Sequence, residues 1–171
     1  MYRNVSAHRL PAIGAGAAPL DFDTATTRGR DLLAAWSPRL LSVMRIVAAF
    51  LFLAHGTQKL LAFPAGQMGP VPLDSLMGLA GVLELVGGTL LLLGLFTRPV
   101  AFVLAGEMAY AYFTAHASRG FWPIANGGEL AALYCFIFLY LAAAGAGPWS
   151  ADRRLRRRVG TPVQLIERGV R

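Results

Sequence analysis

The fold is decided by residues 45–59, RIVAAFLFLAHGTQK, a strongly apolar run with charged or polar side chains at both ends. Further apolar residues flank it, so the whole run can cross a bilayer, which takes about 20 helical residues. At about 100° per residue, Arg45, His55 and Lys59 fall on one face of this helix. Lipid does not solvate such groups, so we expect this face to turn towards protein or water, with the other helices supplying its partners.

The composition favours a membrane protein of a single domain. The chain has 171 residues, 56% of them hydrophobic, and its mean hydropathy of +0.52 is too high for an ordinary soluble domain. The net charge is +7, but five arginines precede Leu40 and seven follow Trp149, so the charge flanks the apolar part. This distribution is typical of cytoplasmic membrane flanks and argues against nucleic acid as a partner.

Four hydrophobic segments, at residues 39–63, 76–96, 99–118 and 128–146, are each close to the roughly 20 residues that cross a membrane. The connections between them are short. The sequence therefore predicts an all-α fold, an integral membrane four-helix bundle over residues 38–150. Residues 1–37 are predicted to be a flexible N-terminal segment, with a short turn of helix at 31–36 that ends at Pro38. Residues 151–171 are predicted to form a basic cytoplasmic tail, with Ser150 or Asp152 capping the helix that follows.

The arginines also predict the orientation. With both termini in the cytoplasm, thirteen arginines lie inside, against Arg119 and Lys59 outside. All three tryptophans lie at segment ends, where amphipathic rings prefer the membrane interface. The role of the basic tail stays open between an anionic-lipid contact, a site for an acidic partner and a topology anchor.

A set of ionisable residues is predicted to lie within the membrane. Its acidic members are Glu84, Glu107 and Glu129 in the second, third and fourth segments. Estimated depths favour pairs between Arg45 and either Glu107 or Glu84, and between Lys59 and Glu129. Three carboxylates against two cations require one more positive charge, either a proton on Glu84 or a charge on His55. Such a network suits proton-coupled or redox chemistry, but buried ion pairs can also specify helix association without any chemistry. The predicted network is Arg45, His55, Lys59, Glu84, Glu107 and Glu129.

Metal and thiol chemistry find little support in the sequence. No His-x-x-x-His or Glu-x-x-His pair is present, so neither a di-iron nor a haem site is indicated, and we expect no metal ligands and no covalently bound cofactor. The single cysteine, Cys135, cannot form an intramolecular disulfide and is predicted to pack in the protein. His116 lies on the far side of its helix from Glu107 and is predicted to be a hydrogen-bonded interface residue.

Several blocks, in order, resemble the DoxX family of small bacterial integral membrane proteins. They are Arg45 with the HGTQK block that ends at Lys59, GxxExxGG around Glu84, GLFTR at 94–98, EMA from Glu107, NGGE ending at Glu129, and GAGPWSAD at 145–152. The resemblance implies a four-helix bundle in the bacterial cytoplasmic (inner) membrane. Members of the family are described as oxidoreductase subunits, with relatives in thiosulfate:quinone oxidoreductase and in complexes linked to thiol and oxidative stress.

Three functions compete on this basis. The first is a membrane subunit of a quinone-linked or thiol/oxidative-stress oxidoreductase system. In that case quinone is the candidate ligand and a soluble oxidoreductase is the partner that carries the redox cofactor. The second is an anchor or assembly protein that recruits soluble enzymes to the bilayer, and the third is a small-molecule or proton-linked transporter. Four segments are few for a transporter, although a homo-oligomer would supply more. Whether the chain itself is catalytic stays open.

Overall fold

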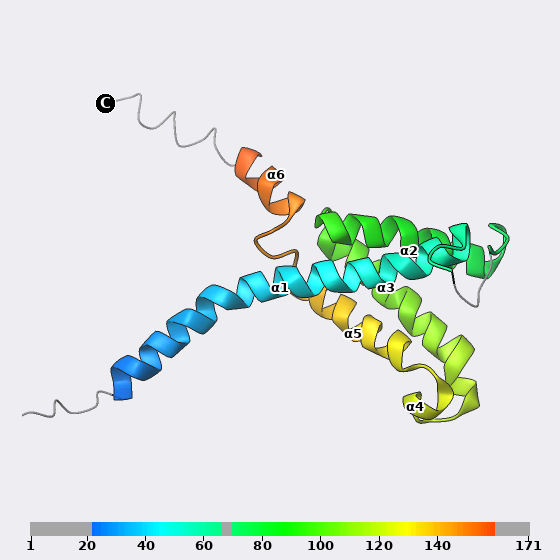
Figure 1. The fold of residues 1–171 in the computed structure, drawn as a ribbon, viewed down its shortest axis with the longest axis horizontal. Helices are drawn as coiled ribbons and strands as arrows, with labels where there is room; N and C mark the ends of the chain where they lie inside the picture. The colour runs from blue at the N-terminus through cyan, green and yellow to red at the C-terminus, as the bar shows by residue number, and fades with distance from the viewer. Residues whose placement is uncertain (1–21, 66–69, 160–171) are drawn as a thin grey trace, which may run out of the picture. The chain divides into compact units, whose positions relative to one another are not determined.

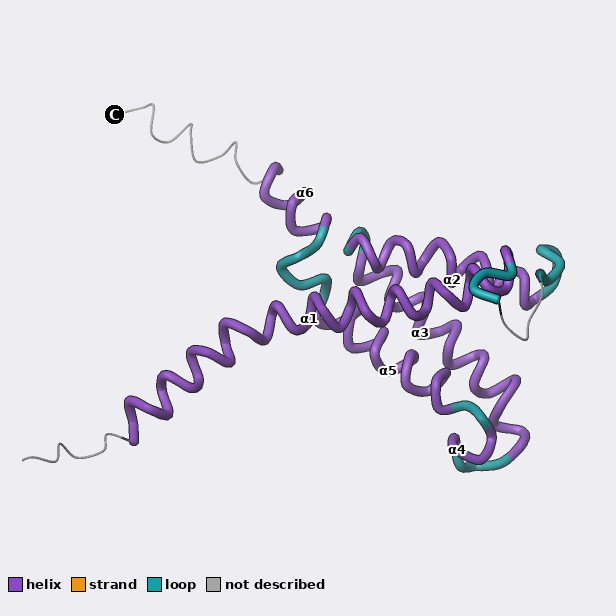
Figure 2. Tube along the Cα trace, viewed as in Figure 1, coloured by secondary structure: helices purple, strands orange, loops and turns teal. Residues whose placement is uncertain are grey.

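A computed structural model describes residues 22–65 and 70–159 of the chain, and all of the regular secondary structure within those residues is helical (Figures 1 and 2). The elements are α1 (Phe22–Leu61), α2 (Leu76–Leu93), α3 (Thr97–Ala111), η1 (Tyr112–His116), η2 (Ala117–Arg119), α4 (Pro123–Asn126), α5 (Glu129–Ala144) and α6 (Ala151–Val159). The all-α prediction is therefore confirmed for the described part of the chain.

The chain divides into two compact units, Met1–Ala34 and Ala35–Arg171. The described part of the first unit is helical from Phe22 onwards. Residues 1–21, which make up most of the predicted flexible segment, lie outside the described residues. Residues 160–171 of the predicted basic tail also lie outside them. The second unit contains all the elements from α2 to α6, and the site described below lies within it.

Pro38 does not end a helix. The sequence predicts that a short helical turn stops there, but α1 continues through Pro38 to Leu61. Proline removes one helical hydrogen bond and normally kinks or breaks a helix. Here the Ser42 hydroxyl donates to the Pro38 carbonyl at 3.3 Å, one turn further along the same helix. The prediction of a stop was wrong because a long apolar helix tolerates one missing bond.

Local signals fix the ends of α2. Ser75 is its N-cap, and the Ser75 side chain accepts a hydrogen bond from the Gly78 N–H at 2.9 Å. At the other end Gly94 adopts a left-handed conformation with φ of 67°, and its N–H donates to the Leu91 carbonyl at 3.0 Å. Glycine adopts this conformation without steric cost, so α2 stops there and the chain turns directly into α3.

One buried core joins α1, α2, α3 and α5. Phe52 of α1 packs against the rings of Tyr134 and Phe138 of α5, with ring centroids 5.2 and 4.8 Å away. Leu91 of α2 and Leu104 of α3 complete the same cluster, at 0% and 1% exposure. Many outward-facing apolar side chains on these helices are exposed, which suits a protein whose surroundings are lipid.

Within the described part of the chain, two helices are long and apolar enough to cross a membrane, judged by length and composition. They are residues Leu33–Leu61 within α1 and the whole of α2, Leu76–Leu93. The third and fourth predicted segments appear as shorter α-helices, α3 with 15 residues and α5 with 16. After Ala111 the chain continues from α3 as the π-helical turn η1, a wider winding that is rare in proteins and frequent at functional sites.

Candidate functional site

Arg45 is fully buried and makes its hydrogen bonds to backbone carbonyls of α2 and of the loop after α5. Its acceptors are the carbonyl oxygens of Leu91, Leu92 (2.8 Å), Ala146 (3.0 Å) and Trp149 (2.6 Å). The last carbonyls of a helix have no intrahelical partner and lie at the negative end of its dipole. The guanidinium group therefore caps α2 and fastens the loop at residues 145–150 to it.

The predicted pairing of Arg45 with Glu107 or Glu84 is wrong. Side chains of an α-helix lean towards its N-terminus, so Arg45 extends away from the carboxylates and towards the end of α2. Every residue has a backbone carbonyl, so the sequence does not indicate which carbonyls accept a hydrogen bond from Arg45. Acidic side chains are visible in the sequence, and the prediction therefore favoured them as partners.

We call the contacts of Arg45 with the end of α2 and with the loop at residues 145–150 the clasp. Two further residues, Ser42 and Gly147, complete it. The Ser42 hydroxyl accepts a hydrogen bond from the Trp149 N–H at 3.2 Å. Gly147 has a φ of 73°, and a Cβ atom there would lie 2.3 Å from the Ser42 Oγ, so only glycine fits. The backbone of the GAGPWSAD block therefore packs directly against α1 at Ser42.

Asp152 caps α3 and not α6, the helix in which it lies. Its carboxylate accepts hydrogen bonds from the N–H groups of Phe96, the N-cap residue of α3, at 2.8 Å and of Thr97, the first residue of α3, at 3.0 Å. The prediction that Asp152 caps the following helix is wrong, and the alternative, Ser150, is confirmed. The Ser150 Oγ accepts from the Arg153 N–H at 3.3 Å.

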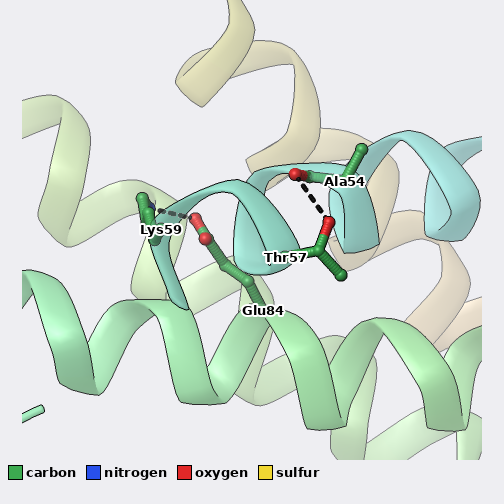
Figure 3. Close-up of polar contacts among 4 residues, drawn as sticks. All are labelled: Ala54, Thr57, Lys59 and Glu84. Atoms are coloured by element: carbon green, nitrogen blue, oxygen red, sulfur yellow. Dashed lines mark hydrogen bonds and ion pairs between the residues drawn. The ribbon is translucent and has the colours of Figure 1, made fainter. Parts of the chain in front are cut away.

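A second polar centre joins α1 to α2. The Lys59 Nζ donates to the Glu84 Oε1 at 2.5 Å, and the two side chains are only 11% and 3% exposed. Figure 3 shows the lysine of α1 and the carboxylate of α2 directed towards each other, beside the local bond from Thr57 to the Ala54 carbonyl. The predicted pair of Lys59 with Glu129 is wrong, because Lys59 leans back along α1 towards the middle of α2.

Glycines bring the two helices close enough for this pair to form. A Cβ atom at Gly56 of α1 would lie 2.6 Å from the Leu85 backbone nitrogen of α2. Likewise, a Cβ atom at Gly88 of α2 would lie 3.2 Å from the Leu53 Cα of α1. Small residues at such crossings let membrane helices pack with their backbones nearly in contact. The glycines of the HGTQK and GxxExxGG blocks thus position Lys59 beside Glu84.

Glu107 of α3 faces the same region. Both of its carboxylate oxygens are buried without a hydrogen-bond partner among the described residues, as is the second oxygen of Glu84. Leaving a buried acceptor unsatisfied costs about 1–3 kcal/mol in most proteins. Three buried carboxylate oxygens therefore remain available to a donor.

These groups line one pocket of about 620 Å³ between α2 and α3. Lys59, Glu84 and Glu107 are its charged residues, and most of the other lining residues are apolar side chains such as Leu76, Leu83 and Val103. A cavity of this size, mainly apolar with a few convergent polar groups, is the usual form of a small-molecule site. Thr114 and Ala115 of the π-helical turn η1 also line it, so the irregular winding forms part of the wall.

The remaining predicted site residues lie elsewhere. His55 is half-buried, and its ring contacts that of Tyr134 edge-on with centroids 6.2 Å apart. Glu129 is exposed in the first turn of α5 and is not part of the pocket lining. His116 Nδ1 lies 3.1 Å from the Asn126 carbonyl, which confirms its prediction as a hydrogen-bonded interface residue. In the described residues 22–65 and 70–159 no three His, Cys, Asp or Glu side chains cluster as a metal site would require.

Comparison with known proteins agrees with the blocks in this chain. The DoxX family profile matches residues 40–117. An uncharacterized protein of Haemophilus influenzae is 51% identical over 125 residues, which cover 70% of this chain and 92% of that protein. The chain belongs to the DoxX family. The matched range includes Arg45, Lys59, Glu84 and Glu107, so both polar centres draw on the part of the chain that defines the family.

Two further relatives place this DoxX-family chain among membrane proteins. An uncharacterized membrane protein of Mycobacterium tuberculosis is 32% identical over 145 residues, covering 74% of this chain and 88% of that protein. The inner membrane protein YphA of Escherichia coli is 29% identical over 131 residues, covering 68% and 91%. No solved structure shows significant similarity to the chain.

The roles of several residues were not predicted from the sequence. These include the contact of Ser42 with the Trp149 N–H and the capping of α3 by Asp152, although Asp152 stands in a quoted block. Gly106 lines the pocket, and a Cβ atom there would meet no atom within 4 Å. Asn126, which is 1% exposed, donates to the Gly120 carbonyl at 2.9 Å and accepts from the Gly128 N–H at 2.8 Å. The NGGE block was the available signal, and its role is to shape the turn before α5.

Proposed function

We propose that this DoxX-family protein is a multi-pass protein of the bacterial inner membrane, with α1, α2, α3 and α5 crossing as a four-helix bundle. Three observations support this arrangement. These four helices share one buried core, YphA carries the name of an inner membrane protein, and thirteen arginines flank the apolar part on the side assigned to the cytoplasm. Both termini are then cytoplasmic.

We further propose that it is the membrane subunit of an oxidoreductase system and that the pocket between α2 and α3 binds a quinone. The observation that carries this proposal is the combination of an apolar pocket of about 620 Å³ with one ammonium group and two carboxylates. A quinone has an apolar ring and tail, two carbonyl oxygens that accept hydrogen bonds, and hydroxyl groups that donate them once it is reduced. Each of these features has a counterpart in the pocket.

The charged pocket residues have different roles towards a bound quinone. The Lys59 ammonium group donates to a quinone carbonyl while it remains paired with Glu84. The Glu107 carboxylate, buried without a partner among the described residues, accepts a hydrogen bond or a proton from the reduced form. Conversion of a quinone to a quinol takes up two electrons and two protons. In this direction a redox partner protein supplies the electrons, and the carboxyl groups, protonated from water beforehand, pass protons to the quinone oxygens. Oxidation of the quinol runs both transfers in reverse, and the carboxylates then accept the protons.

The apolar wall gives the ligand a route of entry. Leu76, Leu79 and Val103 line the pocket and are each more than half exposed, at 64%, 55% and 53%. In a bilayer these side chains contact acyl chains, so a lipid-soluble molecule can enter sideways between α2 and α3. A water-soluble substrate gains nothing from such an opening, and this favours a membrane-dissolved ligand.

Binding of a short-chain ubiquinone to the full chain in lipid nanodiscs tests the proposal. Glu107→Gln keeps the shape of the side chain but removes a charge, and Gly106→Leu places a side chain in the open space of the pocket. The matched control is Glu129→Gln, which removes the same charge at an exposed position outside the pocket. We expect saturable binding by the wild type and by the control, weaker binding by Glu107→Gln, and none by Gly106→Leu.

Quinone binding also separates this function from anchoring or assembly. A protein that only recruits soluble enzymes has no use for the pocket, so its wild-type form would show no saturable quinone binding. Wild-type protein that binds no quinone in nanodiscs would remove the quinone proposal. Equal binding by wild type and Gly106→Leu would move any quinone site away from this pocket.

A further inference from the structure

A second cleft, of about 410 Å³, lies where α5 ends and α6 begins, at the opposite end of α2 from its Ser75 cap. Its lining includes three arginines, Arg98, Arg153 and Arg156, and the apolar residues Pro38, Leu41 and Ala144. The cleft is separate from the pocket that contains Lys59 and Glu84, because the two share no lining residue.

The cationic side of this cleft is not neutralised within the described protein. Asp152 is the acidic residue in its lining, and both carboxylate oxygens of Asp152 accept hydrogen bonds from the start of α3. Across residues 22–65 and 70–159, the guanidinium groups of Arg98, Arg153 and Arg156 form no ion pair and no hydrogen bond. Three arginines therefore converge on a cavity with their donors available to an anion.

The backbone is shaped to leave room for these side chains. Gly145 has a φ of 88°, and a Cβ atom there would lie 3.4 Å from the Arg98 Nε. A larger residue would therefore be strained in its backbone, and its Cβ atom would lie in ordinary van der Waals contact with Arg98. Arg153 and Arg156 are three positions apart on α6, so they fall on the same face of that helix.

The position of the cleft indicates the kind of anion. The C-cap of α2, Gly94, ends a helix of membrane-spanning length, and Asp152 N–H donates to the Gly94 carbonyl at 2.9 Å. The cleft therefore lies at the level where hydrocarbon gives way to phosphate groups. Trp149, 53% exposed, lies in the same loop, and amphipathic rings prefer this level of a bilayer.

We propose that this cleft binds the phosphate group of an anionic phospholipid. Arginine guanidinium groups match the geometry of phosphate oxygens with paired donors. Pro38, Leu41 and Ala144 give the cleft an apolar surface for the start of an acyl chain. The basic residues of α6 then act as a headgroup site and not only as a topology anchor. This proposal is independent of the quinone proposal, because it concerns a different cavity.

Thermal unfolding of the full chain in detergent micelles tests the lipid site. The additives are phosphatidylglycerol, zwitterionic phosphatidylcholine, and water-soluble glycerol 1-phosphate, and the variants are Arg98→Gln, Arg153→Gln and Arg156→Gln. Arg154→Gln is the matched control, since it removes the same charge from α6 but does not line the cleft. Binding to the native state raises the unfolding temperature. We expect phosphatidylglycerol to raise it more than phosphatidylcholine, and each cleft variant to lose at least about half of that rise, whereas the control keeps it.

Each outcome bears on the proposal. Equal stabilisation by glycerol 1-phosphate, with the same dependence on the cleft arginines, would support the phosphate site and assign it to a soluble phosphate compound. An equal loss in Arg154→Gln and in the cleft variants would overturn the proposal, because it would show attraction to overall charge. So would equal stabilisation by the two phospholipids.

Discussion

Lys59 and Glu84 lie 25 positions apart on two different helices, yet their Nζ and Oε1 atoms are 2.5 Å apart and almost fully shielded. The pair forms because glycines let α1 and α2 cross with their backbones nearly touching. It therefore has two roles in this account, since it joins the helices and also lines the pocket between α2 and α3.

Replacing one member of the pair separates these roles. Lys59→Met leaves Glu84 buried without its cation, and breaking a buried pair in this way costs about 3–5 kcal/mol. We expect a fall of this size in the free energy of unfolding, measured by denaturant titration in micelles. The double variant Lys59→Met with Glu84→Met should regain most of it, because well-packed apolar residues can replace a buried ion pair. A stable Lys59→Met protein would show that the pair does not hold the helices.

The helix crossing gives a second prediction, on two helical glycines whose surroundings differ: Gly56 is buried against α2, whereas Gly106 is exposed. Gly56→Ala places a Cβ atom 2.6 Å from the Leu85 backbone nitrogen, and such overpacking costs about 1–3 kcal/mol. Gly106→Ala meets nothing within 4 Å, and alanine stabilises a helix interior by about 0.5–1 kcal/mol relative to glycine. In micelles, the free energy of unfolding should therefore fall for Gly56→Ala and rise for Gly106→Ala. Equal destabilisation would contradict the close approach at Gly56.

The sequence predicted the helices better than it predicted their partners. The apolar segment predicted at residues 76–96 located the start of α2 at Leu76 and its end to within three residues, because backbone satisfaction in lipid depends on local composition. The pairing of charges failed for Arg45 and Lys59, because depth along a membrane normal ignores the lean of side chains towards the helix N-terminus. Capping of α2 by Arg45 could not be predicted at all, since backbone carbonyls are the same in every sequence.

Asp152 offers a test of the contacts between the start of α3 and the loop before α6. Asp152→Ala removes the acceptor for the N–H groups of Phe96 and Thr97, and loss of such a cap costs about 0.5–2 kcal/mol. Asp74→Ala is the control, because Asp74 is an exposed loop aspartate that makes no bond of this kind with any residue that the structure describes. Differential scanning of both proteins should show a lower unfolding temperature for Asp152→Ala alone. A matching fall in the control would remove the capping role.

The proposed orientation can be tested with single cysteines. In a Cys135→Ser background, Asp74→Cys marks the connection before α2, and Arg154→Cys marks α6. A membrane-impermeant maleimide applied to intact spheroplasts should label Asp74→Cys at once, and Arg154→Cys only after permeabilisation. The reverse pattern would place both termini outside.

The central claim, that the pocket of Lys59, Glu84 and Glu107 binds a quinone, is tested most directly by photolabelling. A photoreactive azidoquinone is activated with the protein in nanodiscs, and the labelled residues are located by mass spectrometry. We expect label on the pocket-lining residues of α2 and α3, competed by unlabelled short-chain ubiquinone and lost in Gly106→Leu. Label spread over the exposed apolar faces, unchanged by competitor or by Gly106→Leu, would contradict it.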